Sequence, residues 1–194
     1  MSKLLSIVIP SHNKTELLMA AIASILGESG FDTRCEICVS DNSLSESTSE
    51  DFTEKYDGDE RLIYRRSLDS PGLDGNVDRA VSMAKGEYVW VFGDDDLIVP
   101  GMIGSVLELL EKERYGLLVV NSQSFKDDKI VEQGRHFLLK DREYGPSENE
   151  DFLMDMGGYL TYVCSAIIKK DLWMSNFNST LIGSFFAHLS TFLN

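Results

Sequence analysis

The chain has 194 residues, of which 43% are hydrophobic and 26% are charged, so it is long enough for one globular domain with a substantial core. Its 32 acidic and 18 basic residues give a formal net charge of −14. This charge argues against a nucleic-acid partner, because no basic stripe is available to neutralise phosphates. An anionic ligand would need a local cation to approach such a surface, which favours a metal site.

The three cysteines are an odd number and do not form a disulfide framework, which indicates a reducing compartment. Cys35 and Cys38 have C-x-x-C spacing, but residues three apart in a strand diverge, so we expect no shared metal there. No apolar run reaches the roughly 18 residues of a transmembrane helix. We therefore expect a cytoplasmic protein, with peripheral association at the inner face of a membrane left open.

Strands and helices alternate over the first 121 residues. Short apolar runs predict strands at 4–9, 36–40, 62–65, 88–92 and 116–121. Helical spacing of apolar residues predicts helices at 15–27, 45–56, 77–85 and 100–113, with a turn-rich loop at 70–76. This order predicts an α/β fold with a mostly parallel central sheet and helices on both faces.

The pattern changes after residue 121. Residues 122–141 alternate polar and apolar types around Asp127 and Asp128, which suggests a hairpin or an extended excursion. A short helix is expected at 146–156, a further strand at 162–168 and an apolar helix at 181–194. That last stretch has no cap and its Phe and Leu side chains need a packing partner, so we expect the chain to be truncated at its C-terminus.

Three consecutive carboxylates, Asp94 to Asp96, follow the predicted strand at 88–92. Adjacent acids repel one another unless a cation or hydrogen-bond donors offset them, and Mg²⁺ and Mn²⁺ bind carboxylate oxygens and bridge phosphates. Asn13 and Asp41 also follow predicted strands, and open α/β sheets bind ligands at the carboxyl ends of their strands. We therefore expect one edge of the sheet to hold a phosphate-bearing ligand. The alternative is a solvated acidic turn.

Four ordered motifs resemble those of the family 2 glycosyltransferases: LSIVIPSHN (5–13), VSDNS (39–43), AKGEY (84–88) and DDD (94–96). The resemblance is strong over residues 4–113 and weaker at 162–173. It implies a Rossmann-like GT-A fold, with residues 1–121 as the nucleotide-sugar-binding core and 122–194 as a smaller acceptor-side region. It also implies an enzyme that moves a sugar, with inversion, from a nucleotide-diphosphate sugar to an acceptor hydroxyl.

The resemblance assigns one group of residues to the nucleotide-sugar. These residues are Pro10, Ser11, His12, Asn13, Asp41, Asp74, Asn76, Arg79 and Asp94. Asp41 would accept a hydrogen bond from the base, although an N-cap or Asx turn explains the same residue. Arg79 would reach the base or a phosphate, and its alternative is an ordinary surface charge.

The metal motif of the family is D-x-D, often followed by another Asp, and the resemblance implies Mg²⁺ or Mn²⁺ as its cofactor. Here Gly93 stands at the first position, Asp95 matches the metal-binding last Asp, and Asp96 follows it as the second candidate ligand. The first carboxylate is therefore missing. Asp94 is a candidate to replace it.

The family usually supplies its general base as an Asp or Glu after the segment at 162–173. Residues 177–186 contain no acid, so the nearest titratable group is His188, whose ordinary pKa suits a base near neutral pH. A lone His among Phe residues is more often structural. Asp96 is a second candidate for a catalytic role, and Asp151 and Asp155 are weaker ones.

The resulting hypothesis is a metal-dependent glycosyltransferase of bacterial surface polysaccharide or glycoconjugate synthesis, acting on a saccharide or lipid-linked saccharide acceptor. A non-catalytic or truncated nucleotide-sugar-binding domain is the alternative. A nucleotidyltransferase is a third interpretation, but it should carry a Gly-rich basic loop after the first strand, and residues 11–14 are not one.

Overall fold

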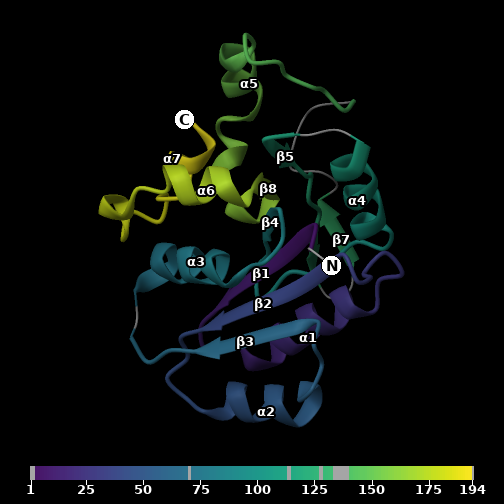
Figure 1. Ribbon diagram of the computed structural model, residues 1–194, viewed down its shortest axis with the longest axis vertical. Coiled ribbons are helices and arrows are strands. Elements are labelled where there is room, and N and C mark those ends of the chain that lie inside the picture. Colours follow the sequence, from purple (N-terminus) through teal and green to yellow (C-terminus); the bar gives the residue numbers. More distant parts are fainter. Residues whose placement is uncertain (1–2, 70, 113–114, 127–128, 133–139, 194) are drawn as a thin grey trace.

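The computed structural model describes residues 3–69, 71–112, 115–126, 129–132 and 140–193 (Figure 1). The elements in chain order are β1 (Leu5–Ser11), α1 (Thr15–Leu26), β2 (Cys35–Asp41), α2 (Ser47–Tyr56), β3 (Leu62–Arg66), α3 (Gly72–Met83), β4 (Tyr88–Val91), α4 (Met102–Lys112), β5 (Leu117–Val119), β6 (Ser124–Lys126), β7 (Lys129–Glu132), α5 (Asn149–Met156), β8 (Ala166–Lys169), α6 (Lys170–Asn176) and α7 (Leu189–Phe192). None of the described helices combines the length and the apolar character that crossing a bilayer requires.

The central sheet has six strands in the order β3-β2-β1-β4-β8-β5. The first four in sequence, β1 to β4, pair in parallel, whereas β8 runs antiparallel between β4 and β5. The carboxyl ends of β1, β2 and β4 therefore meet at one edge, and the start of β8 lies at the same edge because that strand runs the other way (Figure 1). The predicted mostly parallel sheet is confirmed.

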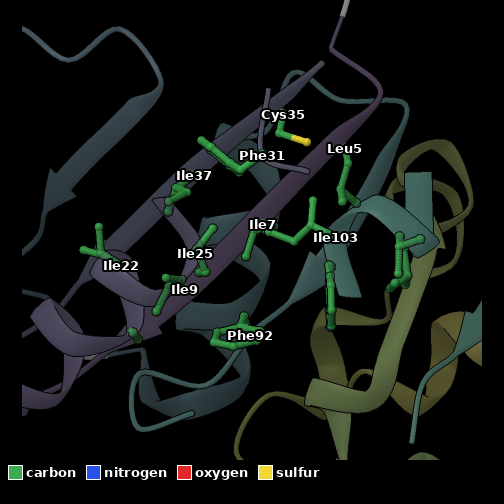
Figure 2. Close-up of a cluster of buried hydrophobic side chains, with 14 of the residues drawn as sticks. Leu5, Ile7, Ile9, Ile22, Ile25, Phe31, Cys35, Ile37, Phe92 and Ile103 are labelled. Carbon is green, nitrogen blue, oxygen red and sulfur yellow. The ribbon is translucent and has the colours of Figure 1, made fainter. Parts of the chain in front are cut away.

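Both faces of the sheet are covered by helices. Figure 2 shows Ile22 and Ile25 of α1 and Ile103 of α4 against Ile7 and Ile9 of β1 in one buried cluster. The alternate strand residues pack against α3 and α6 on the opposite face. Since fully burying one Ile or Leu contributes roughly 1.5–3 kcal/mol, these two layers account for much of the stabilisation of the fold.

The two cysteines of the C-x-x-C spacing lie in different layers. Cys35 belongs to the first hydrophobic cluster and Cys38 to the second, and both are fully buried. Burial raises the pKa of each thiol. The expectation that they share no metal agrees with this placement.

The antiparallel strands β6 and β7 form a separate two-stranded sheet and confirm the hairpin expected within residues 122–141. Asp127 and Asp128 lie outside the described residues.

The predicted loop at 70–76 is wrong from residue 72 onward, because α3 begins at Gly72 and not at Val77. Gly72 has φ +70°, which suits glycine at the entry to the helix. Asp74 and Asn76 are buried in the first turns and bond to distant segments. These tertiary contacts override the local turn preference of a Pro-Gly-Leu-Asp-Gly sequence.

The strand predicted at 162–168 is shorter than expected. Only β8, from Ala166, is extended, and two 3₁₀ turns (Tyr159–Thr161 and Val163–Ser165) precede it. The Ser165 hydroxyl donates to the Tyr162 carbonyl at 2.7 Å, and Trp90 Nε1 donates to the Cys164 carbonyl at 3.0 Å. Such side-chain bonds to the backbone compete with strand pairing.

The helix predicted at 181–194 is also wrong over most of its length. Among the residues described up to 193, its helical parts are Leu181, which ends a 3₁₀ turn (Ser179–Leu181), and the four residues of α7. The N–H groups of Gly183, Phe185 and Ala187 donate to the Asp74 carboxylate at 2.8, 2.9 and 3.2 Å. Phe185 has φ +67°, which lies outside the right-handed helical region, so the segment cannot continue as a regular helix through this residue.

Candidate functional site

The loops that follow β1 and β2 are bonded to each other. The backbone N–H of Asn13 donates to the Ser43 hydroxyl at 2.8 Å, and the Leu44 N–H donates to Asn13 Oδ1 at 3.0 Å. His12 Nδ1 lies 3.0 Å from both the backbone oxygen and Oδ1 of Asn42. Asn13 has φ +56°, which Asn tolerates better than most residues. The polar groups expected at this edge therefore lie together.

Pro10 and Ser11 lie beyond the strand predicted at 4–9, but they are the last two residues of β1. The pairing of β1 with β4 ends at Val8, so the missing N–H of Pro10 removes no bond to that strand. Asn76 joins this edge from α3. It accepts the Ser40 hydroxyl at 2.7 Å and donates to the Ser11 carbonyl at 3.2 Å.

Asp41 is fully buried at the end of β2. Its Oδ1 accepts the Ser43 N–H at 2.8 Å and the Ser43 hydroxyl, and its Oδ2 accepts the Tyr64 hydroxyl at 2.6 Å. The first of these bonds is the Asx turn that the sequence left open. Burial and the bond to Asp41 raise the pKa of Tyr64. A carboxylate has about four acceptor positions, so one remains for a ligand donor.

Two of the three consecutive acids share a cation. Lys14 Nζ lies 3.0 Å from Asp94 Oδ1 and 2.8 Å from Asp95 Oδ2. Asp94 is buried and its other oxygen accepts the His12 N–H at 3.3 Å, whereas the Asp95 side chain is half exposed. Partial burial opposes the charged form of Lys14, but its bonds to Asp95 and Asp94 outweigh this and raise its pKa.

The position of Lys14 tests whether this site suits a divalent metal. Its ammonium marks a point at which two carboxylates converge on one positive charge, and Mg²⁺ is commonly held by one or two carboxylates together with substrate phosphates. The residues fit such an ion. In the part of the chain that the structure describes, no group of three or more His, Cys, Asp and Glu side chains is arranged around a metal position. The other ligands would therefore come from the nucleotide and water.

Asp96 points to a different partner. The Tyr162 hydroxyl lies 3.2 and 3.4 Å from its two oxygens. Burial and the negative charge of Asp95 raise the pKa of Asp96, and the bond from Tyr162 acts in the opposite direction. Burial also raises the pKa of the neighbouring Cys164 thiol. Asp96 thus does not share the Lys14 contact that joins Asp94 and Asp95.

Asp74 and Arg79 have partners within the protein. Asp74 is buried and accepts the three backbone N–H groups of the segment 183–187. Arg79 donates to Asp69 at 2.6 Å, and its Nη1 is buried without a hydrogen-bond partner among the described residues. A buried guanidinium nitrogen without a hydrogen-bond partner does not fit an ordinary surface charge.

His188 is buried immediately before α7 and its ring lies near those of Phe186 and Phe192. Its Nε2 lies 3.1 Å from the Leu160 carbonyl. A carbonyl only accepts, so Nε2 carries the proton and Nδ1 keeps its lone pair. Burial lowers the pKa of His188, which keeps the imidazole neutral at pH 7. Asp151 and Asp155 pair with Arg142 on the surface.

Several residues that build this edge were not predicted from the sequence: Lys14, Asn42, Ser43, Tyr64 and Tyr162. Asn42 and Ser43 lie within the VSDNS motif, and Lys14 directly follows the first motif, so proximity to a strand end was the available signal. Tyr64 and Tyr162 gave none, because their contacts to Asp41 and Asp96 bridge 23 and 66 residues.

Comparison with known proteins identifies the family. The sequence profile described as "Glycosyl transferase family 2" matches residues 6–173. The chain therefore belongs to the family 2 glycosyltransferases. Abequosyltransferase RfbV of Salmonella typhimurium is 30% identical over 196 residues, which cover 96% of this chain and 59% of RfbV. The chain thus spans about six tenths of the length of this curated relative.

Two solved structures share the fold. Residues 1–349 of S. aureus TarS in complex with UDP align with a TM-score of 0.69 at 18% identity, covering 97% of this chain and 54% of that one. The mannosyltransferase PcManGT of Pyrobaculum calidifontis, in complex with GDP-Man and Mn²⁺, aligns with a TM-score of 0.66 at 14% identity, covering 97% and 51%. The likeness confirms the GT-A fold class.

Proposed function

We propose that this protein transfers a sugar, with inversion, from a nucleotide-diphosphate sugar to an acceptor hydroxyl. The observation that carries the proposal is the convergence of Asp94 and Asp95 on the charge of Lys14 at the carboxyl edge of the sheet. That edge is where open α/β sheets bind ligands. Membership of family 2 and the names of the relatives support the same reaction class.

The nucleoside would lie against the joined loops after β1 and β2. His12 and Asn13 shape this surface, and Asp41 accepts a donor of the base or ribose with its remaining lone pair. Arg79 Nη1 supplies an unused donor for the base or a phosphate. Asn76 holds the end of β1, and Asp74 holds the segment 183–187, so both shape the site through other residues.

Mg²⁺ or Mn²⁺ would be held by Asp95, with Asp96 as the second candidate ligand. Asp94 is a further candidate ligand, because it shares the Lys14 ammonium with Asp95. When bound, the ion neutralises charge on the departing nucleoside diphosphate. The Mn²⁺ named in the PcManGT complex supports this assignment. Before the ion and the diphosphate bind, Lys14 offsets the repulsion between Asp94 and Asp95.

His188 is the proposed general base, with Asp96 as the alternative. A neutral imidazole with its lone pair on Nδ1 can take the proton of the acceptor hydroxyl, a step typically worth 10²–10⁴-fold in rate. The acceptor would be a saccharide or a lipid-linked saccharide of bacterial surface polysaccharide or glycoconjugate synthesis. The reaction would take place in the cytoplasm or at the inner face of a membrane.

A second candidate is a domain that binds nucleotide-sugar without catalysing transfer. The burial of His188, with Nε2 engaged by Leu160, favours it, since a base must reach the acceptor. Both candidates predict the same donor site. They differ in whether the protein transfers the sugar of the bound donor.

A thermal-shift panel of UDP-, GDP-, CDP- and dTDP-sugars, each with and without Mn²⁺, tests the donor site. One base should stabilise the protein strongly and only with the metal, because a ligand at 100 times its Kd adds about 2.7 kcal/mol to the free energy of unfolding. Equal, metal-independent shifts for all four, or none, would contradict the proposal. Release of nucleoside diphosphate from the selected donor then separates the enzyme from the binding domain.

A further inference from the structure

The place of the missing first side chain of the metal motif is occupied by the Asp96 carboxylate. A Cβ atom on Gly93 would lie 2.4 Å from Asp96 Oδ2, 3.0 Å from Asp96 Cγ and 3.3 Å from Asp95 Oδ1. Real Cβ atoms essentially never approach another heavy atom within 3.0 Å, so the contact with Asp96 Oδ2 excludes a Cβ, while the other two contacts would be tight. Gly93 is therefore required by the present position of the Asp96 side chain.

The shortest of these distances has a further meaning. In an aspartate, two covalent bonds separate Cβ from each carboxylate oxygen. They hold Cβ and the oxygen at nearly the same distance as the one between a Cβ on Gly93 and Asp96 Oδ2. Asp96 Oδ2 thus lies within reach of the place that a carboxylate on residue 93 would occupy. We propose that Asp96 folds back to replace the first carboxylate of the motif, and that Gly93 and Tyr162 position it. The inference rests on the proposed function.

The backbone and Tyr162 hold Asp96 in this place. The Asp96 N–H donates to the Gly93 carbonyl at 3.3 Å, which closes the turn, and the Tyr162 hydroxyl donates to the carboxylate. Tyr162 is itself fixed, because its carbonyl accepts both the N–H of Ser165 at 3.0 Å and the Ser165 hydroxyl at 2.7 Å. The bond from Trp90 to Cys164 ties this segment to β4. The carboxylate is therefore held from two sides.

The charges around Asp96 agree with a ligand role. Asp95 repels it, and Lys14 is engaged by Asp94 and Asp95. No cationic side chain of the described ranges pairs with Asp96. A half-buried carboxylate that faces a like charge, with the neutral Tyr162 hydroxyl and Cys164 thiol as its donors, is costly for the fold, and such costs concentrate at functional sites.

The proposal predicts that the first carboxylate can be moved between the two positions. Asp96→Gly removes it, and Gly93→Ala displaces it while keeping every carboxylate in the chain. Gly93→Asp combined with Asp96→Gly restores it at residue 93, in the space that Asp96 has vacated. Tyr162→Phe leaves the carboxylate in place but removes its hydroxyl donor.

The test is a titration of Mn²⁺, followed by electron paramagnetic resonance, in the presence of the nucleoside diphosphate that stabilises the wild type. Asp96→Gly and Gly93→Ala should weaken Mn²⁺ binding by about 10- to 100-fold, and Tyr162→Phe by about 10-fold or less. The Gly93→Asp/Asp96→Gly variant should recover most of the loss. Thermal unfolding of each variant checks that it folds. Asp96→Asn, which keeps the shape of the side chain, should bind Mn²⁺ as weakly as Asp96→Gly.

Two failures have different meanings. If the wild type shows no nucleotide-dependent Mn²⁺ binding, the proposed function falls and this inference falls with it. If the wild type binds Mn²⁺ but Asp96→Asn and Gly93→Ala bind it equally well, or the double variant stays as weak as Asp96→Gly, the replacement by Asp96 is wrong while the proposed function stands.

Discussion

The carboxyl edge of the parallel strands and the segment 183–188 are built differently. At the edge, the loops after β1 and β2 share several bonds, and Asp41, His12 and Asn13 each make more than one. The segment 183–188 instead depends on one buried carboxylate, that of Asp74. The edge should therefore tolerate the loss of one contact, whereas the segment should not.

Asp74→Ala should have the largest effect on stability. It leaves the N–H groups of Gly183, Phe185 and Ala187 without their acceptor, and an unsatisfied buried donor costs about 1–3 kcal/mol. Since some of these groups will reach water when the segment loosens, we expect a loss of about 3 kcal/mol in urea unfolding. Asp59→Ala is the matched control, because its pair with Arg61 lies at the surface and should cost about 0.5 kcal/mol. Equal losses would refute the role of Asp74.

Tyr64→Phe tests the redundancy of the edge. It removes one donor to Asp41 and leaves the two bonds from Ser43, so the free energy of unfolding should fall by about 1–2 kcal/mol. Tyr56→Phe is the control, since the Tyr56 hydroxyl is buried without a partner among the described residues and its loss should be neutral or stabilising. The comparison fails if Tyr64→Phe costs as much as Asp74→Ala.

His188→Gln should change the acid dependence of stability. The folded pKa of His188 lies below its unfolded value, so the unfolded chain binds more protons, and wild-type stability is lost as pH falls below about 6.5. The variant should lose less stability over that range, as measured by urea unfolding between pH 7.5 and 5. Identical slopes for the two proteins would show that His188 is not held neutral.

Asp96→Asn should give the smallest change, and it should be a gain. The folded pKa of Asp96 is raised by burial and by Asp95, so the native state binds the proton more tightly and the charged carboxylate lowers stability near neutral pH. The variant should melt at a higher temperature than the wild type at pH 7. The difference should shrink as pH falls through the raised pKa. A lower melting temperature at pH 7 would contradict this account.

The contrast between the carboxyl edge and the segment 183–188 also explains which features could be predicted from sequence. Asp41, Asn13 and Asp94 lie at or just after the ends of apolar strands, which the sequence pattern predicts. Because parallel strands place their carboxyl ends at one edge of the sheet, the proximity of these three residues was predictable. The backbone of 183–187 was not, because its apolar spacing suggests a helix and its acceptor, Asp74, stands 109 residues earlier. The early start of α3 was hidden for the same reason. Local turn residues gave no sign of the distant bonds.

Release of nucleoside diphosphate from the donor selected by binding is the most direct test of the central claim. With Mn²⁺ the wild type should release nucleoside diphosphate, and chelation of the metal should stop it. Asp95→Ala should reduce the rate by about a hundredfold or more, because the charge of the leaving group would lose its stabilisation. A wild type that binds the donor but never releases the diphosphate, or an Asp95→Ala variant as active as the wild type, would contradict the account.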